Sequence, residues 1–215
     1  MSSENVVRTT VNRLEMRKFQ RRRRLVVGIL MILFLVPLAL VGPYFPRRSF
    51  AGVLIHAAAL GCLSAAVLIR VWSAVHVGGR KQLELVESGP YALARNPLYV
   101  GTLFGALGAG LAFGSILLGA LLCGFTFLVF DRVVKLEEMR LRDEFGAAFD
   151  AYAARVPRWA PRTLTPPPAT LQTVDVAVVM RTCMQALVFF SAVVAAMGLD
   201  ALRVAGWLAP LIRLP

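Results

Sequence analysis

The residues best suited to chemistry lie in the stretch Ser88–Gly101, SGPYALARNPLYVG, which a long apolar run follows directly. Pro90 and Pro97 each fix a backbone φ angle and bias the preceding residue toward an extended form, so the loop is pre-shaped. The tyrosines and the asparagine offer aromatic faces and hydrogen-bonding groups, and Arg95 offers a planar fork for a carboxylate. This set suits a polar ligand at a membrane surface. An interfacial loop with an aromatic belt and a topology-setting arginine explains it equally well.

A second candidate is Glu137 in the stretch KLEEMRLRDEFG. It heads a set spaced by four residues, and this spacing predicts the apolar stripe of a helix: Glu137, Leu141, Phe145 and Phe149. A carboxylate on an apolar face near a membrane needs a partner, and a bound cation would supply one. A first-turn acid that complements the helix dipole, or a pair with a neighbouring arginine, is the structural alternative. From this stretch alone the structural alternative is favoured.

The elements that must position these residues are membrane helices. The chain has 215 residues, is 58% hydrophobic and has a mean hydropathy of +0.68, and its apolar residues cluster in long runs. The charge-free run Leu25–Phe45 can span a bilayer core of about 30 Å and lacks a small-residue cleavage pattern, so we expect a retained helix rather than a signal peptide. Further apolar runs are Phe50–Ile69, Leu98–Phe130 and Thr182–Leu199. We therefore expect an integral membrane protein.

The net charge of +12 does not indicate nucleic acid, because the basic residues stand at the ends of the apolar runs. Arg17–Arg24, RKFQRRRR, directly precedes the first run and is typical of a cytoplasmic anchor. With the N-terminus in the cytoplasm, the short loop Pro46–Ser49 lies outside, where its arginines weakly oppose the positive-inside rule. Val71–Pro97 and Lys135–Arg162 then return to the cytoplasm.

The run Leu98–Phe130 predicts a tight hairpin of two short or tilted helices, because its 33 residues exceed one span and fall short of two. Ala112–Ser115, AFGS, can serve as the turn. Four glycines allow close helix contact by their small-xxx-small spacing: Gly101, Gly105, Gly110 and Gly114. An amphipathic segment follows, whose apolar stripe runs on through Tyr152 and Val156 until Pro157 ends it.

These features divide the chain into five expected parts. They are a basic cytoplasmic segment (1–24), two transmembrane helices (25–70), a core with loop, hairpin and amphipathic motif (71–162), a proline-rich linker (163–173), and a transmembrane and interfacial extension (174–215). Trp207 is expected as an interfacial anchor. The cysteines stand singly in apolar runs, so we expect packing rather than a disulfide or a metal site: Cys62, Cys123 and Cys183.

The order of the two candidate clusters resembles the isoprenylcysteine carboxyl methyltransferase and phospholipid methyltransferase superfamily. The chain carries GPYALARNPLYVG, a hairpin, the pair EE, and then FGAAFDAYAARVPRWAP. The superfamily pattern is Gly-x-Tyr, Arg-His-Pro-x-Tyr-x-Gly, a membrane hairpin, Glu-Glu, Phe-Gly-x-x-Tyr-x-x-Tyr and Val-Pro-Arg. Each piece is short, whereas the ordered set is specific. The resemblance covers roughly residues 70–162 and not the last membrane segment.

The resemblance implies a methyltransferase that uses S-adenosylmethionine and a lipophilic acceptor that enters from the bilayer. The implied fold is all-α and polytopic, with about five transmembrane segments, including the hairpin, and a cytoplasm-facing cofactor pocket. By position, the expected cofactor contacts are His76, Leu83, Leu85, Val86, Tyr91, Asn96, Pro97, Leu98, Tyr99 and Glu137. The expected catalytic residues are Arg95, Asn96 and Arg132, the last lying near a family arginine linked to substrate.

One departure from the family pattern bears on the acceptor, since Asn96 stands where the family has histidine. Asparagine keeps a hydrogen-bonding side chain but cannot act as a base near neutral pH. A carboxylate acceptor needs no base, whereas an amine needs a deprotonating partner. We therefore expect a carboxylate acceptor, which the resemblance places on an isoprenoid-like chain. A phospholipid amine methyltransferase stays open, as does a non-catalytic membrane module that keeps the fold and binds a lipid or a partner.

Overall fold

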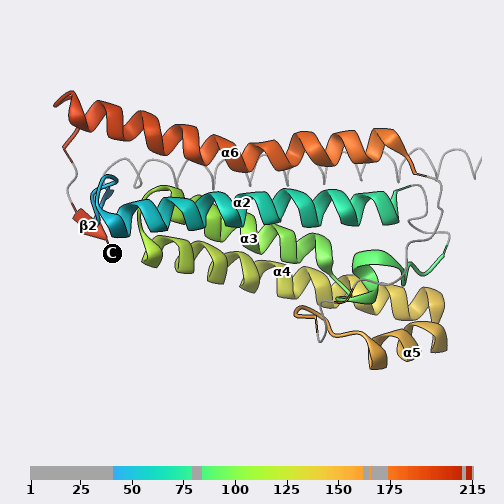
Figure 1. Ribbon diagram of the computed structural model, residues 1–215. Coiled ribbons are helices and arrows are strands. Elements are labelled where there is room, and N and C mark those ends of the chain that lie inside the picture. The colour runs from blue at the N-terminus through green and yellow to red at the C-terminus, as the bar shows by residue number, and fades with distance from the viewer. Residues whose placement is uncertain (1–40, 79–83, 162–164, 166–173, 210–211, 215) are drawn as a thin grey trace, which may run out of the picture.

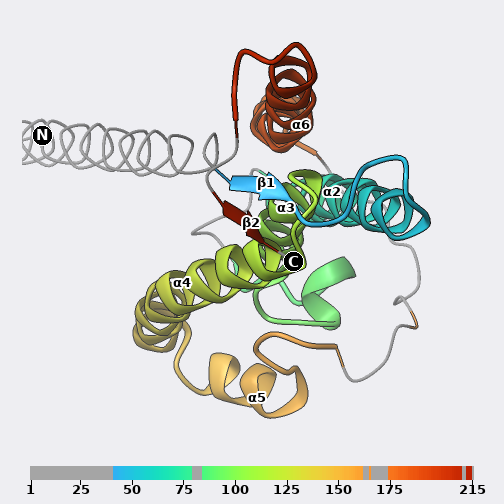
Figure 2. The ribbon, with the colours of Figure 1, turned by 90° about the vertical axis from the view of Figure 1, so that its left-hand side faces the viewer.

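The computed structural model describes residues 41–78, 84–161, 165, 174–209 and 212–214. This part of the chain holds five α-helices and a 3₁₀ turn: α2 (Phe50–Val77), η1 (Gly89–Ala92), α3 (Pro97–Ala112), α4 (Ile116–Phe145), α5 (Ala147–Arg155) and α6 (Val176–Val204). The four longest helices run along one common axis (Figure 1). Seen end-on in Figure 2, α2 and α3 lie between α6 on one side and α4 with α5 on the other. The predicted basic segment 1–24, most of the predicted first membrane helix, and the predicted linker apart from residue 165 lie outside the described residues.

Three of these helices are long and apolar enough to cross a membrane by length and composition, namely α2, α4 and α6. Only 11% of the most apolar 18-residue stretch of α4 is buried inside the molecule. Large apolar side chains therefore face outward, among them Leu68, Phe125 and Val194. An apolar surface of this extent suits lipid rather than water. The chain is a multi-pass membrane protein built of helices, as predicted, while the total of about five spans stays a prediction.

Two helices extend beyond the apolar runs that predicted them. The run Phe50–Ile69 continues as α2 to Val77, and α6 continues to Val204 rather than ending at Leu199. Polar residues in these extra turns are compatible with a helix. Once the apolar part has formed, extending the helix by further turns costs little free energy. The loop that holds the candidate residues is therefore shorter than expected at its start.

A small sheet is the exception to the all-α prediction. Val41–Pro43 forms strand β1, which pairs in parallel with β2 (Ile212–Leu214). The predicted first helix is thus wrong at its end near Phe45, because Gly42 and Pro43 are both poor helix residues. Trp207, close to β2 in the chain, is exposed, and its role as an interfacial anchor stays a prediction.

The predicted hairpin between α3 and α4 is confirmed, and so is its turn. α3 ends at Ala112, and Gly114 adopts a φ of 77°, which glycine reaches without steric cost. The Ser115 hydroxyl then accepts a hydrogen bond from the Leu118 amide at 3.1 Å and caps α4. Only α3, with 16 residues, is short. α4 has 30 residues, because the amphipathic sequence after Phe130 continues the same helix.

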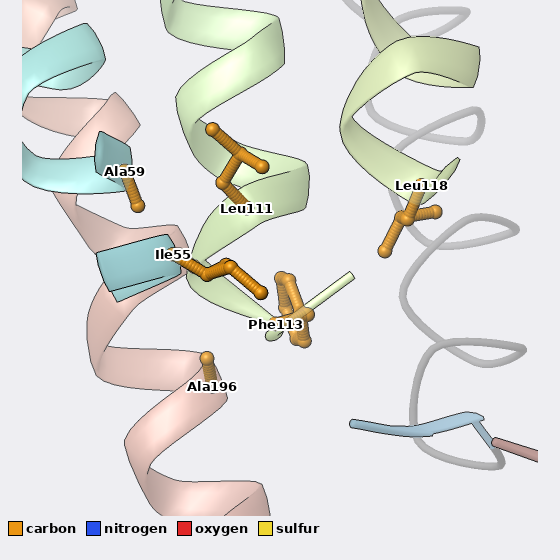
Figure 3. Close-up of a cluster of buried hydrophobic side chains, with 7 residues drawn as sticks. Ile55, Ala59, Leu111, Phe113, Leu118 and Ala196 are labelled. Atoms are coloured by element: carbon orange, nitrogen blue, oxygen red, sulfur yellow. The ribbon is translucent and has the colours of Figure 1, made fainter. Parts of the chain in front are cut away.

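A buried apolar cluster joins the hairpin turn to α2 and α6 (Figure 3). Its labelled members are Ile55, Ala59, Leu111, Phe113, Leu118 and Ala196. Ala196 belongs to α6, so the C-terminal extension packs into the same core as the hairpin. Small residues here let the helices approach closely, which is how membrane helices associate.

The closest approach in the hairpin is between Gly110 of α3 and Gly119 of α4, where a Cβ on Gly110 would overlap the backbone of Gly119. We expect Gly110→Ala to lower the free energy of unfolding by about 1–3 kcal/mol, because two helix backbones would have to separate. Gly124→Ala is the matched control, since nothing lies within 4 Å of its Cβ and alanine is the better helix former. Thermal unfolding in detergent measures both variants. Equal stability of the Gly110 variant and the wild type would contradict the close contact.

Candidate functional site

The predicted loop, the C-terminal part of α4 and α5 meet at one end of the helix bundle (Figures 1 and 2). Two hydrogen bonds join segments that are far apart in sequence. The Tyr152 hydroxyl donates to the Tyr91 carbonyl at 2.7 Å, and the Arg95 amide donates to the Pro157 carbonyl at 2.8 Å. The pieces of the ordered motif therefore form one structural unit.

The apolar stripe of the amphipathic segment holds this unit together. Phe149, Tyr152 and Val156 are buried, with Leu141 and Phe145 packed against them, as predicted. The expected cofactor contact Leu85 packs on the same cluster. The stripe is not one continuous helix, because α4 ends at Phe145 and is followed by Gly146, whose φ of 53° favours glycine. The chain changes direction at this glycine, and α5 packs against the loop.

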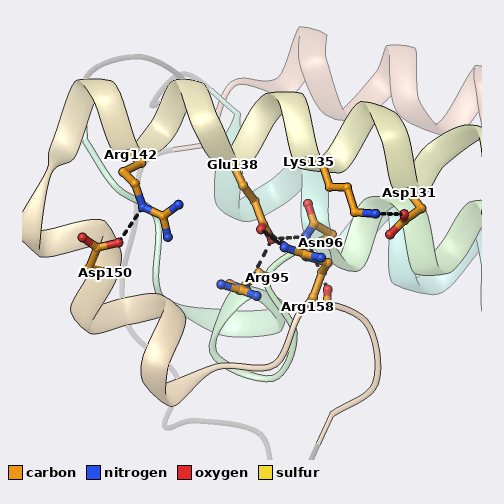
Figure 4. Close-up of polar contacts among 8 residues, drawn as sticks. All are labelled: Arg95, Asn96, Asp131, Lys135, Glu138, Arg142, Asp150 and Arg158. Atoms are coloured by element: carbon orange, nitrogen blue, oxygen red, sulfur yellow. Dashed lines mark hydrogen bonds and ion pairs between the residues drawn. The ribbon is translucent and has the colours of Figure 1, made fainter.

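An ion cluster around Glu138 connects three segments of the site (Figure 4). The Arg158 guanidinium donates to both carboxylate oxygens of Glu138, with Nη2 to Oε2 at 2.6 Å and Nε at 3.1 Å from each oxygen. The Arg95 Nε lies 3.4 Å from Oε1 and makes no aligned hydrogen bond. The Asn96 amide donates to Oε1 and to the Arg158 carbonyl, each at 3.3 Å. The side chain of Glu138 is only 9% exposed.

This cluster gives the loop a fixed position rather than a free set of polar groups. The loop supplies Arg95 and Asn96, α4 supplies Glu138, and the segment after α5 supplies Arg158. A buried carboxylate is tolerated only when cations and hydrogen-bond donors surround it, and the same contact raises the pKa of the Arg158 guanidinium. Arg95 and Asn96 were expected to act on cofactor or substrate, yet both are turned to Glu138 in the structure.

Sequence reasoning missed Glu138 and Arg158, although both stand in the motifs that it used. Counting in steps of four from Phe145 leads to Glu137, which is about 80° off the starting face after eight residues at about 100° per residue. Counting back seven residues from Phe145 instead leads to Glu138, which lies within about 20° of the same helix face. Val134 and Glu138 are indeed the buried residues on this side of α4. The Arg of the Val-Pro-Arg motif was a second available signal.

Glu137 lies beside the cluster and is held differently. Its Oε1 accepts a hydrogen bond from the Tyr99 hydroxyl at 2.9 Å, and the Tyr99 ring packs on Phe130 with centroids 4.8 Å apart. In contrast to Glu138, no cation in the described part of the chain pairs with Glu137. Burial raises the pKa of the Tyr91 hydroxyl, and the nearby negative charge of Glu137 raises it further, so this hydroxyl stays neutral. Half-buried Glu137 thus lies beside two tyrosines and has no cationic partner among the described residues.

His76 lies against this region from α2. Its ring packs on Gly89 so closely that a Cβ there would overlap the imidazole, and Gly89 has a φ of 59°. The His76 Nδ1 is 3.0 Å from the Trp72 carbonyl oxygen. The loop turn at Gly89 therefore packs around the His76 ring, while a contact between His76 and a cofactor stays a prediction.

The remaining predicted site residues differ in their burial and in their position relative to the loop. Pro97 is buried as the first residue of α3, the Leu98 carbonyl accepts from Thr102, and Val86 is half-buried before the turn. Leu83 lies outside the described residues. Arg132 is exposed on α4, about 140° around the helix from Glu137, so the structure does not bring it to the other candidates.

Comparison with known proteins gives one family and two relatives. Residues 47–148 match the family model described as phospholipid methyltransferase. The chain is 33% identical over 146 residues to the nickel-cobalt-cadmium resistance protein NccN of Alcaligenes xylosoxydans xylosoxydans, covering 68% of each chain. It is 33% identical over 144 residues to the cobalt-zinc-cadmium resistance protein CzcN of Cupriavidus metallidurans, covering 67% of this chain and 66% of the relative. No solved structure matches the chain.

Proposed function

The chain belongs to the phospholipid methyltransferase family, as its motif order predicted, and from this premise we propose that it is a membrane-embedded methyltransferase that uses S-adenosylmethionine. One observation carries the proposal. Half-buried Glu137 has a tyrosine hydroxyl as its hydrogen-bond partner and no cation in the described part of the chain. A carboxylate in this position requires a positive partner.

The residues present suit the cofactor by their chemistry. S-adenosylmethionine supplies a methyl group activated by a sulfonium cation, and it also carries an ammonium, a carboxylate and an adenine. Glu137 would balance a positive group, and Tyr99 holds its carboxylate in place at 2.9 Å. The faces of Tyr91 and Tyr99 suit packing against adenine or a cation. An in-line transfer needs mainly alignment, and positioning can contribute up to about 7–11 kcal/mol in ideal cases.

The Glu138 cluster would serve this alignment indirectly. It locks the loop to α4 and to the segment after α5, so Tyr91 and Tyr99 keep their places when a ligand binds. The functional surface is then the Glu137 side of α4, while the Glu138 side is structural. We propose that this end of the bundle faces the cytoplasm, in agreement with the basic residues of the loop and of α4.

The acceptor in this proposal is lipophilic and presents a carboxylate. Asn96 replaces the family histidine, and its amide already donates to Glu138 and to the Arg158 carbonyl. An asparagine with these partners cannot take a proton from an amine, and a carboxylate acceptor requires no such step. A phospholipid amine methyltransferase and a non-catalytic lipid-binding module are the alternatives that the experiment must separate.

A contribution to metal tolerance is a second candidate function, favoured by the names of the two relatives. In the described segments no group of three or more His, Cys, Asp or Glu residues could hold a metal ion. We propose that any such contribution acts through the methyl-transfer site. Host growth on nickel, cobalt or cadmium should then depend on Tyr99 and Glu137, and tolerance restored equally by Glu137→Ala and the wild type would argue against that route.

Binding of S-adenosylmethionine to the full chain, purified in detergent with added lipid, tests the proposal directly. We expect calorimetry to show micromolar affinity that Tyr99→Ala weakens, because Tyr99 positions the Glu137 carboxylate. Incubation with donor labelled on the methyl group and a membrane lipid extract then identifies the product. Base-labile methyl esters would support the carboxylate acceptor and labelled head-group amines the alternative. A folded protein that binds no cofactor would favour the non-catalytic module.

A further inference from the structure

Arg70 is a cation inside the bundle that the proposed cofactor site does not use. It lies in the apolar helix α2, and its side chain is only partly exposed. Its Nη1 donates to the Thr102 hydroxyl of α3 at 2.7 Å, and its guanidinium lies 5.8 Å from the ring centroid of Phe189 in α6. Gly101 makes room for the stem, since a Cβ there would lie 2.7 Å from the Arg70 Cγ. Three helices thus enclose this side chain.

No acidic side chain balances this charge within the described segments. Arg70 forms no ion pair there, and its buried Nε has no hydrogen-bond partner. The cation–π contact with Phe189 compensates only a small part of the charge. A largely enclosed arginine without a counterion is costly, and a bound anion would balance its charge. The unpaired Arg70 Nε and the lack of an acidic partner among the described residues therefore favour an anionic ligand.

The position of Arg70 relates it to the proposed cofactor site. Thr102, its partner, follows Tyr99 by three residues on α3, so both side chains lie on neighbouring parts of one helix face. Tyr99 in turn contacts Glu137. Because α3 begins at the site end of the bundle with Pro97, the contact between Arg70 and Thr102 lies about one helical turn further from that end than Tyr99.

We propose that Arg70 binds the anionic head of the lipophilic acceptor and holds it beneath the cofactor site. This inference rests on the proposed methyltransferase function and assigns Arg70 to the carboxylate at the end of the acceptor's apolar chain. The apolar chain would lie along the outward faces of the helices, and the planar guanidinium fork matches a carboxylate. Phe189 forms one wall of this subsite, so α6, which lies outside the family match of residues 47–148, shapes the acceptor end.

The same guanidinium could donate hydrogen bonds to the phosphate of a bilayer lipid, and the experiment distinguishes the two sources of the anion. Binding of oleate, oleyl alcohol and dioleoyl phosphatidate is measured on the full chain in an uncharged detergent. We expect oleate to bind about 10- to 100-fold more tightly than the alcohol, because a charge-assisted hydrogen bond is added to the same chain. Phosphatidate bound more tightly than oleate would assign Arg70 to a bilayer lipid and overturn the acceptor role.

Substitution of Arg70 tests whether the preference for oleate over oleyl alcohol depends on this side chain. We expect Arg70→Gln to abolish the preference for oleate over oleyl alcohol and to leave the affinity for S-adenosylmethionine unchanged, which also shows that the variant folds. Glu144→Gln, an exposed change on α4, should alter neither affinity. A preference that survives Arg70→Gln overturns the inference.

A second variant covers the case in which Arg70→Gln does not fold. Arg70→Lys keeps the charge and loses the fork, so oleate should bind several-fold more weakly while the alcohol is unaffected, and unchanged oleate affinity overturns the inference. Failure of the wild type to bind S-adenosylmethionine would reject the proposed function instead, because the oleate comparison does not depend on the cofactor.

Discussion

Replacing Glu138 by alanine is expected to lower the free energy of unfolding by about 3–5 kcal/mol, the range for removing one partner of a buried ion pair. The carboxylate accepts from Arg158 at 2.6 and 3.1 Å and lies 3.4 Å from the Arg95 guanidinium. Its removal leaves one arginine largely buried without a counterion, and it leaves the Asn96 amide without one of its two acceptors. Three segments then lose their common attachment point.

Thermal unfolding in detergent measures this loss, and Glu87→Ala provides the matched control. Glu87 pairs with Arg155 at 2.6 Å, but the arginine side chain is 66% exposed, and such surface pairs contribute about 0–1 kcal/mol. We expect the Glu87 variant to unfold close to the wild type and the Glu138 variant far below it. Similar unfolding temperatures for the two variants would show that the Glu138 cluster is not a structural centre.

Local patterns in the sequence were sufficient for the hairpin and for the apolar stripe. The turn needs a residue with positive φ and a capping hydroxyl, and Gly114 and Ser115 supply both within four residues. The stripe depends only on the period of a helix, which is why Phe149 and Tyr152 are buried as predicted. These features are encoded by neighbours in the chain, so no knowledge of the tertiary structure is required.

The parts that depend on distant contacts could not be predicted in the same way. Two adjacent glutamates differ in the structure because Glu138 faces two arginines that approach from other segments, whereas Glu137 faces tyrosines. A count in steps of four cannot resolve them, since the error of the step grows along the helix. The placement of Arg70 against Thr102 and Phe189 likewise depends on how α2, α3 and α6 pack, which no local period records.

The assignment of function to Glu137 leads to the opposite expectation for its variant. We expect Glu137→Gln to weaken S-adenosylmethionine binding about 10- to 100-fold, since an ionic hydrogen bond contributes about 1.5–3 kcal/mol. The free energy of unfolding should stay within about 0.5 kcal/mol of the wild type, because glutamine can still accept from the Tyr99 hydroxyl and no salt bridge among the described residues is lost.

Calorimetry with S-adenosylmethionine and thermal unfolding of the same preparation separate the two glutamates. Glu144→Gln on the same helix controls for the loss of one negative charge, because Glu144 is exposed. Cofactor affinity that falls for Glu137→Gln without a loss of stability, together with stability that falls for Glu138→Ala, would establish that Glu137 binds the ligand and that Glu138 holds the surrounding segments in place. Unchanged affinity in Glu137→Gln would reject the cationic ligand, because charge is the property that this substitution removes from the site.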